Sequence, residues 1–249
     1  MSSILLASTN VFGGGPVTAF THVGASYERS TTNTTTKTFT VPSGAQAGDL
    51  LIATSFMDRS TYIQNDSHQL GGAQGEYNNP SDPLTGWSFV GSNTSGSEYP
   101  EGVTWFRVWD GVTTSWTVQW HNADTSAGIM VAFRPDNPIT SLSSEQFKES
   151  DGYLSLSDTI SSVSSTNAPG GRIYMYFLTG RMLSYIQNPS PTFSPSSGWT
   201  HVDGEPLSST DQMDYAYKLA SAGDGFVSTT ISTNDTGRQA QHFFIVNAT

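Results

Sequence analysis

The sequence predicts an all-β protein: two tandem antiparallel β-sandwich domains, jelly-roll-like and related by internal duplication, with a short N-terminal arm. Three observations predict this fold. The chain resembles itself at an offset of about 110 to 123 residues, which suits two domains and is too long for a solenoid repeat. Apolar and polar residues alternate in short segments, and turn signals separate these segments about every 8 to 12 residues.

The internal repeat rests on four anchors that occur in the same order in both halves. The clearest is Gly86-Trp87, which recurs as Gly198-Trp199. The other pairs are 59–65 with 181–188, 106–108 with 217–219, and 124–133 with 235–244. The first repeat carries about ten extra residues near 68–79, rich in Gly and Asn, which predict a surface-loop insertion.

Residues 1–28 precede the repeat and are expected to form either an arm or a first strand. Ile4, Leu5 and Leu6 make a short apolar patch, and the glycine run 13–15 behind it predicts a hinge. One interpretation is a first strand that completes domain one. The other is a tether that docks on a neighbouring subunit through Ile4, Leu5 and Leu6.

The two domains are expected at 29–139 and 140–249. In the first, strands are predicted near 39–41, 50–53, 106–108 and 116–120, with turns at 42–44 and 110–111. In the second, 173–177 has the same short apolar character, and 223–225 is a turn signal. Pro135 and Pro138 cannot continue a central strand, so 135–138 is expected to link the domains.

Comparison of the repeats predicts which strand faces are buried. Phe106 and Val108 correspond to Tyr217 and Leu219, so this face stays apolar in both copies and is expected to be core. The pattern 116, 118 and 120 is apolar in both copies as well. Trp116 and its neighbours are therefore expected in the core, and the tryptophans of the two Gly-Trp pairs are expected to be structural.

The opposite face of the strand near residue 106 predicts a contact site. It reads Trp105, Arg107 and Trp109 in the first repeat, where the second repeat has small or polar residues. These side chains are expected to stack a sugar ring, to form a cation–π arrangement with Arg107, or to pack against the other repeat or a neighbouring subunit. Burial under a loop or under the second domain is the plainer alternative.

Charge and composition exclude several classes of function. The 249 residues include 10 basic and 21 acidic side chains, for a formal net charge of −11, which argues against binding nucleic acid or anionic membrane. The absence of cysteine excludes disulfides and thiolate metal sites. The N-terminus lacks a basic segment and a long apolar run, so we expect synthesis in the cytoplasm without a signal peptide and no membrane insertion.

Catalytic motifs are absent from the sequence, so no enzyme, cofactor or metal site is expected. There is no nucleophile elbow, zinc-protease motif, phosphate loop or dinucleotide fingerprint. The five histidines are dispersed, and none recurs at the equivalent position of the other repeat. The acidic pairs Asp203/Glu205 and Asp211/Asp214 are expected in solvated loops, although they are the only carboxylates that suggest calcium or glycoside chemistry.

Several motifs together resemble the β-sandwich modules of tailed-bacteriophage structural proteins. They are the run from Val41 through Gly48 and Asp49 into an apolar strand, the Gly-Trp pair, and an aromatic–basic strand such as 215–218. The resemblance covers roughly residues 30 to 249 and supplies no catalytic residues. It implies a location on the virion surface, as a capsid decoration or a tail or fibre component.

Three functions follow, of which the first is expected. The first is a non-enzymatic virion structural protein that binds capsid or tail subunits and forms a homo-oligomer. The second is an adhesin that stacks host-surface glycans on Trp105, Arg107 and Trp109, or on Tyr77 in the inserted loop. The third is a carbohydrate-active enzyme that uses the acidic pairs.

Overall fold

A computed structural model of the chain describes residues 17, 19–57, 68–70, 86–93, 101–153, 157–164, 172–181, 193–195, 198–202, 211–219, 226–233 and 238–249. Within these ranges every regular element is a β-strand, and every strand pairing is antiparallel. The all-β expectation is therefore confirmed. The described residues contain no helix that is long and apolar enough to cross a membrane.

The first half of the chain forms one sheet with the strand order β1-β6-β2-β5-β4, and β3 pairs with β6 beside this path. Its strands are β1 (Phe20–Thr40), β2 (Leu50–Met57), β3 (His68–Leu70), β4 (Ser88–Asn93), β5 (Glu101–Val108) and β6 (Ser115–Pro135).

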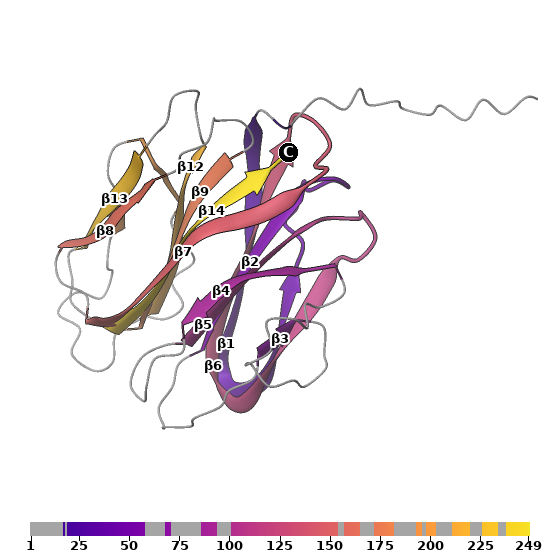
Figure 1. Cartoon of the computed structure of the whole chain (residues 1–249). Coiled ribbons are helices and arrows are strands. Elements are labelled where there is room, and N and C mark those ends of the chain that lie inside the picture. The colour runs from indigo at the N-terminus through magenta and orange to yellow at the C-terminus, as the bar shows by residue number, and fades with distance from the viewer. Residues whose placement is uncertain are drawn as a thin grey trace, which may run out of the picture.

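The second half forms a sheet with the order β11-β12-β9-β14-β7 and a smaller one with the order β10-β13-β8. Its strands are β7 (Leu142–Tyr153), β8 (Ser157–Ser164), β9 (Arg172–Arg181), β10 (Phe193–Pro195), β11 (Thr200–Val202), β12 (Asp211–Leu219), β13 (Phe226–Thr233) and β14 (Arg238–Ala248). Figure 1 shows these sheets as successive layers, with the two five-stranded paths next to each other.

Strands β1 and β6 are long because they serve two layers. They pair near Phe20 and Pro135 and again near Phe39 and Trp116, with register shifts between these stretches. Bulges of this kind increase local twist and bend a strand. Figure 1 shows the two strands bending together, which carries Phe39 and Trp116 back over the outer face of their own sheet.

Among the described residues, the buried apolar side chains form two clusters on opposite faces of the first sheet. The described members of the outer cluster all lie in the first half: Phe39, Leu51, Ala53, Trp87, Val103, Trp105, Met130 and Ala132. The central cluster joins the two halves and comprises Val17, Phe20, Leu50, Ile52, Phe56, Val90, Phe106, Ala127, Ile129, Val131, Phe133, Ile173, Tyr215, Phe244, Val246 and Ala248. Because both faces are covered, β2 and β6 carry nearly continuous apolar runs instead of a clean alternation.

The predicted faces agree with this arrangement. Phe106 is buried in the central cluster, and Tyr217 and Leu219 pack against it, so the expected core face is confirmed. Trp87 is buried in the outer cluster, and Trp116 packs against that cluster. Gly86 and Gly198 share a positive φ, 89° and 90°, so each Gly-Trp pair begins with the same turn, one that favours glycine.

Other expectations meet the structure in part. Residues 20–28 belong to strand β1, as in the first-strand interpretation, whereas Ile4, Leu5 and Leu6 lie outside the described residues. Residues 68–70, expected in a loop, form strand β3, and the rest of the insertion lies outside the described residues. The prolines at 135 and 138 flank the turn between β6 and β7 as expected, and the division into domains 29–139 and 140–249 stays a prediction.

Candidate functional site

The predicted contact residues lie on the outer face of β5 and its extension. Trp105 is only 5% exposed and belongs to the outer cluster, and Arg107 is 8% exposed. Trp109 is half-buried and packs against the same cluster. The structure therefore brings the three side chains together on one face but covers most of that face with the protein's own chain.

Arg107 is held by aromatic rings other than the two that flank it in sequence. Its guanidinium carbon lies 5.0 Å from the ring centroid of Trp116 and 5.6 Å from that of Trp87. The two rings meet edge to face at 5.1 Å. Arg107 therefore makes cation–π contacts, but β6 and the Gly-Trp turn supply the rings, in place of the expected Trp105 and Trp109.

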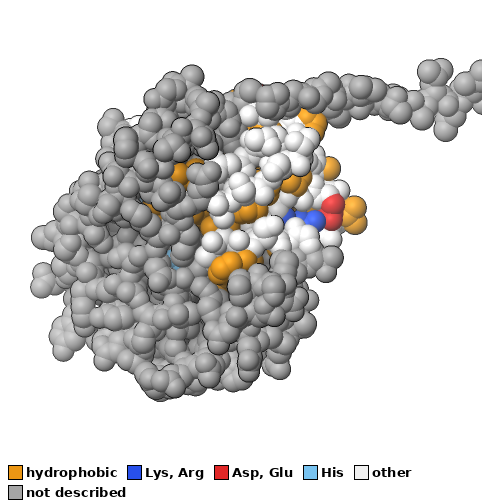
Figure 2. Space-filling view, viewed as in Figure 1, with side chains coloured by type: hydrophobic (Ala, Val, Ile, Leu, Met, Phe, Trp, Pro, Cys, Tyr) orange, Lys and Arg blue, Asp and Glu red, His pale blue; other side chains and the backbone are white. Residues whose placement is uncertain are grey.

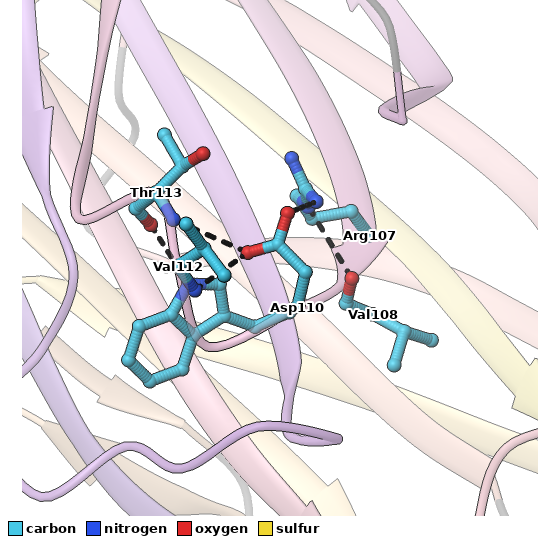
Figure 3. Close-up of polar contacts among 6 residues, drawn as sticks. Arg107, Val108, Asp110, Val112 and Thr113 are labelled. Carbon is cyan, nitrogen blue, oxygen red and sulfur yellow. Dashed lines mark hydrogen bonds and ion pairs between the residues drawn. The ribbon is translucent and has the colours of Figure 1, made fainter.

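The loop that follows β5 closes over Arg107. Figure 3 shows Asp110 Oδ2 accepting a hydrogen bond from Arg107 Nη2 at 3.0 Å, and Arg107 Nε donating to the carbonyl of Val108 at 3.3 Å. Asp110 Oδ1 accepts from the backbone N–H groups of Val112 and Thr113. These backbone hydrogen bonds, followed by the Arg107 charge, lower the pKa of the Asp110 carboxyl.

Trp109 is fixed by the same loop. Its indole Nε1 donates to the carbonyl oxygen of Thr113 at 2.7 Å. At the tip of the loop the side chain of Val112 is 80% exposed. The surface open to a partner here is therefore the half-buried rings of Trp109 and Trp116 together with Val112, whereas Trp105 offers almost no ring surface.

The glycan-stacking role of Trp105, Arg107 and Trp109 stays a prediction. Tyr77 and the apolar arm residues Ile4, Leu5 and Leu6 lie outside the described residues.

A second charged contact, which the sequence did not predict, fixes the turn between β1 and β2. Arg134 on β6 donates from Nε and Nη2 to the two carboxylate oxygens of Asp49, each at 3.0 Å. Asp49 is 2% exposed and also accepts from the backbone N–H of Gln46, while Arg134 donates to the carbonyl of Gly44. This hydrogen bonding to Asp49 raises the pKa of Arg134. Asp49 belongs to the Gly48-Asp49 motif noted in the sequence, but its partner Arg134 lies 85 residues away in the chain.

His22 on β1 bridges the two halves. Its Nε2 shares a 2.8 Å hydrogen bond with the hydroxyl of Tyr215 on β12, and its ring stacks on Tyr217 at 4.9 Å between centroids. Burial lowers the pKa of His22 and raises that of Tyr215, so both groups are held in their neutral forms.

His242 on β14 makes a second bridge, in a fully buried position. Its Nδ1 shares a 2.8 Å hydrogen bond with the hydroxyl of Thr104 on β5, which in turn shares one of 2.8 Å with Thr54 on β2. The ring lies 4.9 Å from that of Phe56. Burial lowers the pKa of His242 to about 3. Sequence comparison missed both bridges because neither histidine recurs in the other repeat.

Of the acidic residues at 203, 205, 211 and 214, the structure describes the side chain of Asp214 alone. Asp214 lies on β12 at 1% exposure and is 3.1 Å from Nε2 of His201, so its expected place in a solvated loop is wrong. Alternation along β12 puts Asp214 on the face opposite Tyr215, and the side chain is buried there. Asp211 begins the same strand, and Asp203 and Glu205 lie outside the described residues. Among the side chains that the structure describes, no three His, Asp or Glu residues are grouped to hold a metal ion.

Figure 2 shows that uncharged polar and apolar side chains dominate the described part of one molecular face, with a blue and red pair at its edge. This surface carries no strong charge of either sign.

Comparison of the chain with protein-family models, with curated proteins and with solved structures gives no match.

Proposed function

We propose that the chain is a non-enzymatic structural protein on the surface of a bacteriophage virion, where it docks on capsid or tail subunits. The observation that carries the proposal is that three pairs of charged or titratable side chains among the described residues form contacts within the fold. Arg107 with Asp110, Arg134 with Asp49, and His201 with Asp214 each tie a strand to a turn or to a second strand. Groups fixed in this way stabilise a scaffold and are not left free for chemistry.

The location on a virion is supported by the sequence resemblance, and the contacts of its motif agree with a structural role. Gly48 and Asp49 bind the backbone of Trp109, at 2.9 and 2.8 Å, and thereby join the β1–β2 turn to the end of β5. The motif thus forms one corner of the sheet.

We also propose that the two halves are duplicated sandwich domains. The order β1-β6-β2-β5-β4 in the first half has the same connectivity as β7-β14-β9-β12-β11 in the second. The small strands agree as well. In the first half, β3 pairs with residues 118–120, in the first part of the long strand β6. In the second half, β10 pairs with residues 231–233 of β13, the separate strand that precedes β14. A shared order of this length, with a shared way of connecting the strands, supports duplication of one module.

The registers support the same correspondence. Leu50 pairs with Val108 and Phe133 in the first half, and Ile173 pairs with Leu219 and Val246 in the second. By strand register, Phe133 is therefore equivalent to Val246. The alignment of the two repeats in sequence pairs Phe133 with Phe244 instead, two residues earlier in the last strand. A shift of two keeps each side chain on the same face.

Each domain also contains contacts on its outer face. In the first, Trp87 packs in the outer cluster. In the second, the equivalent Trp199 lies 5.9 Å from Phe243, between ring centroids. Each domain thus has a buried outer side besides the central cluster.

The alternative function is an adhesin that recognises glycans on a host cell. The half-buried rings of Trp109 and Trp116 beside the exposed Val112 favour it, because a sugar ring can stack on a partly open indole. Binding of cell-surface glycans that is lost in Trp109→Ala, and retained in Val112→Ala, would support the adhesin.

The test of the first proposal is to locate the protein in its native particle by cryo-electron microscopy or by antibody labelling of purified virions. Many symmetric copies over the capsid support decoration, and a few copies at the tail support a tail or fibre component. Absence from every purified particle would overturn the virion proposal. Matched labelling with an antibody to the major capsid subunit controls for particle integrity.

A further inference from the structure

We propose that the inward faces of the two halves form a self-complementary interface with pseudo-two-fold symmetry. The partner that each sandwich module is shaped to bind is therefore a second copy of the same module, here supplied by the same chain. This inference rests on the duplicated sandwich domains proposed above. It concerns the surfaces that meet in the central cluster.

Equivalent positions from both modules meet in that cluster. Phe106 of the first module is buried in the cluster, and its equivalent Tyr217 packs against the cluster from the second module. The same holds for five further pairs on the two sides of the cluster: Leu50 and Ile173, Val131 and Phe244, Phe133 and Val246, Phe20 and Leu142, and Val90 and Val202. Such a patch, contributed by the same positions of both partners, defines an isologous interface.

One pair of strand contacts across the interface is reciprocal, while β4 of the first module also contacts β7 and β14 of the second. Strand β14 of the second module contacts β5 of the first, and β6 of the first contacts β12 of the second. Because β6 is equivalent to β14 and β5 to β12, these are one contact made twice with the partners exchanged. A two-fold axis produces this exchange, whereas a simple translation of one module along the other does not.

The polar bridges follow the same pattern. Thr104 on β5 and Tyr215 on β12 are equivalent, and each shares a 2.8 Å hydrogen bond with a histidine of the opposite module. The histidines differ in place, since His242 lies on β14 and His22 on β1. Sequence divergence has therefore changed the bonded residues while a polar bridge is present at both equivalent positions.

The interface is separate from the core within the first module. All described residues of the outer cluster precede residue 140. The central cluster, in contrast, has members on both sides of residue 140. Surfaces that bury apolar residues of two modules in this way resemble an obligate subunit interface.

The experiment is to cut the folded full-length chain between the modules. A protease recognition sequence is inserted between Asp136 and Asn137, in the turn that joins β6 to β7, where Asp136 is exposed. After cleavage we expect the two pieces to co-elute as a one-to-one complex at the volume of the intact protein. Dilution of a labelled complex, followed by fluorescence anisotropy, then gives the Kd.

Two aromatic substitutions in the cut protein make the test specific. Tyr217→Ala removes a ring that contacts His22 and Phe133 of the other module, so we expect the Kd to rise about tenfold or more. Trp109→Ala removes a half-buried ring that packs within the first module, and we expect the Kd to stay within about twofold.

Two results would overturn the inference: separation of the pieces in native buffer, or an equal change of Kd in both variants. Circular dichroism of separated pieces distinguishes the causes of a failure. If the separated pieces keep their β-sheet signal, the proposal of duplicated domains stands and only the proposed pairing is wrong. If they lose the signal, both proposals are wrong. Neither result affects the test of location on the virion.

Discussion

Arg107 shows how a side chain that looks like a binding residue in the sequence is used for packing. Two indole rings, the Asp110 carboxylate and a backbone carbonyl surround its guanidinium. Gly86 adjoins this arrangement: a Cβ there would lie 3.4 Å from the guanidinium atoms, about van der Waals contact, and it is the φ of +89° that disfavours other residues. The planar, delocalised charge of arginine suits such a site better than an ammonium group does.

We expect Arg107→Lys to lower the free energy of unfolding by about 1 kcal/mol, because the compact ammonium cannot lie near both indole rings and also reach Asp110. Urea denaturation followed by tryptophan fluorescence measures the change. Asp110→Asn is the matched control: it keeps an oxygen for the backbone N–H groups and removes only a partly exposed ion pair, so its effect should be smaller. Equal losses in the two variants would contradict the stacking account.

His242 makes the stability of the protein depend on pH. Its folded-state pKa of about 3 lies below the ordinary value of 6.5, so the unfolded chain binds a proton at pH values where the folded chain does not. The stabilisation from neutral His242 is therefore complete above pH 6.5 and is lost as the pH falls from there towards 3. Thr104 and Phe56 contact this ring, and the register of β14 with β7 pairs His242 with Glu149.

We expect the free energy of unfolding to fall by about 1 kcal/mol per pH unit through this range from His242 alone. Urea denaturation at a series of pH values measures the slope. His242→Asn keeps a short polar group and removes the titration, and we expect its slope to be flatter by this amount. An unchanged slope would show that other groups cause the acid sensitivity.

At the scale of elements, the bent β1–β6 pair decides how the first half closes. Its register shifts let Phe39 fold over the outer face, where the ring lies against Gly128. A Cβ at Gly128 would overlap this ring, so the glycine is required by close approach and not by its backbone angles. The alternation of residues predicts strands here, but it does not show that one pair of strands serves two layers.

We expect Gly128→Ala to lower the free energy of unfolding by about 1 to 3 kcal/mol through overpacking against Phe39. The double variant Gly128→Ala, Phe39→Leu gives the added methyl group room, so it should be more stable than the sum of the two single changes implies. Thermal unfolding of the four proteins of this cycle provides the measurement. Additive effects would show that the two residues do not contact each other in solution.

At the scale of the whole molecule, the central cluster couples the two halves. It buries large side chains from both, and the His22 and His242 bridges add polar contacts across it. Neither half can unfold without exposing apolar surface of the other. This coupling distinguishes the molecule from two domains joined only by a linker.

We expect the intact protein to unfold in one cooperative transition, with equal calorimetric and van't Hoff enthalpies, because of this shared cluster. Differential scanning calorimetry measures both. Two resolved transitions would contradict the coupling. Tyr217→Ala should broaden the transition or split it, whereas Trp109→Ala should only move its midpoint.

The sequence by itself determined the all-β class, the core face of Phe106 and Tyr217, and the structural place of Trp87. These follow from local rules, since alternation with a period of two sorts residues onto faces and a Gly-Trp pair directly precedes a strand in each repeat. The sequence could not show that Arg107 meets Trp116, that Asp49 meets Arg134, or that His242 meets Thr104. These partners are distant in the chain, and only the tertiary structure decides which faces meet, because strands of either half bury the same kinds of residue on both sides.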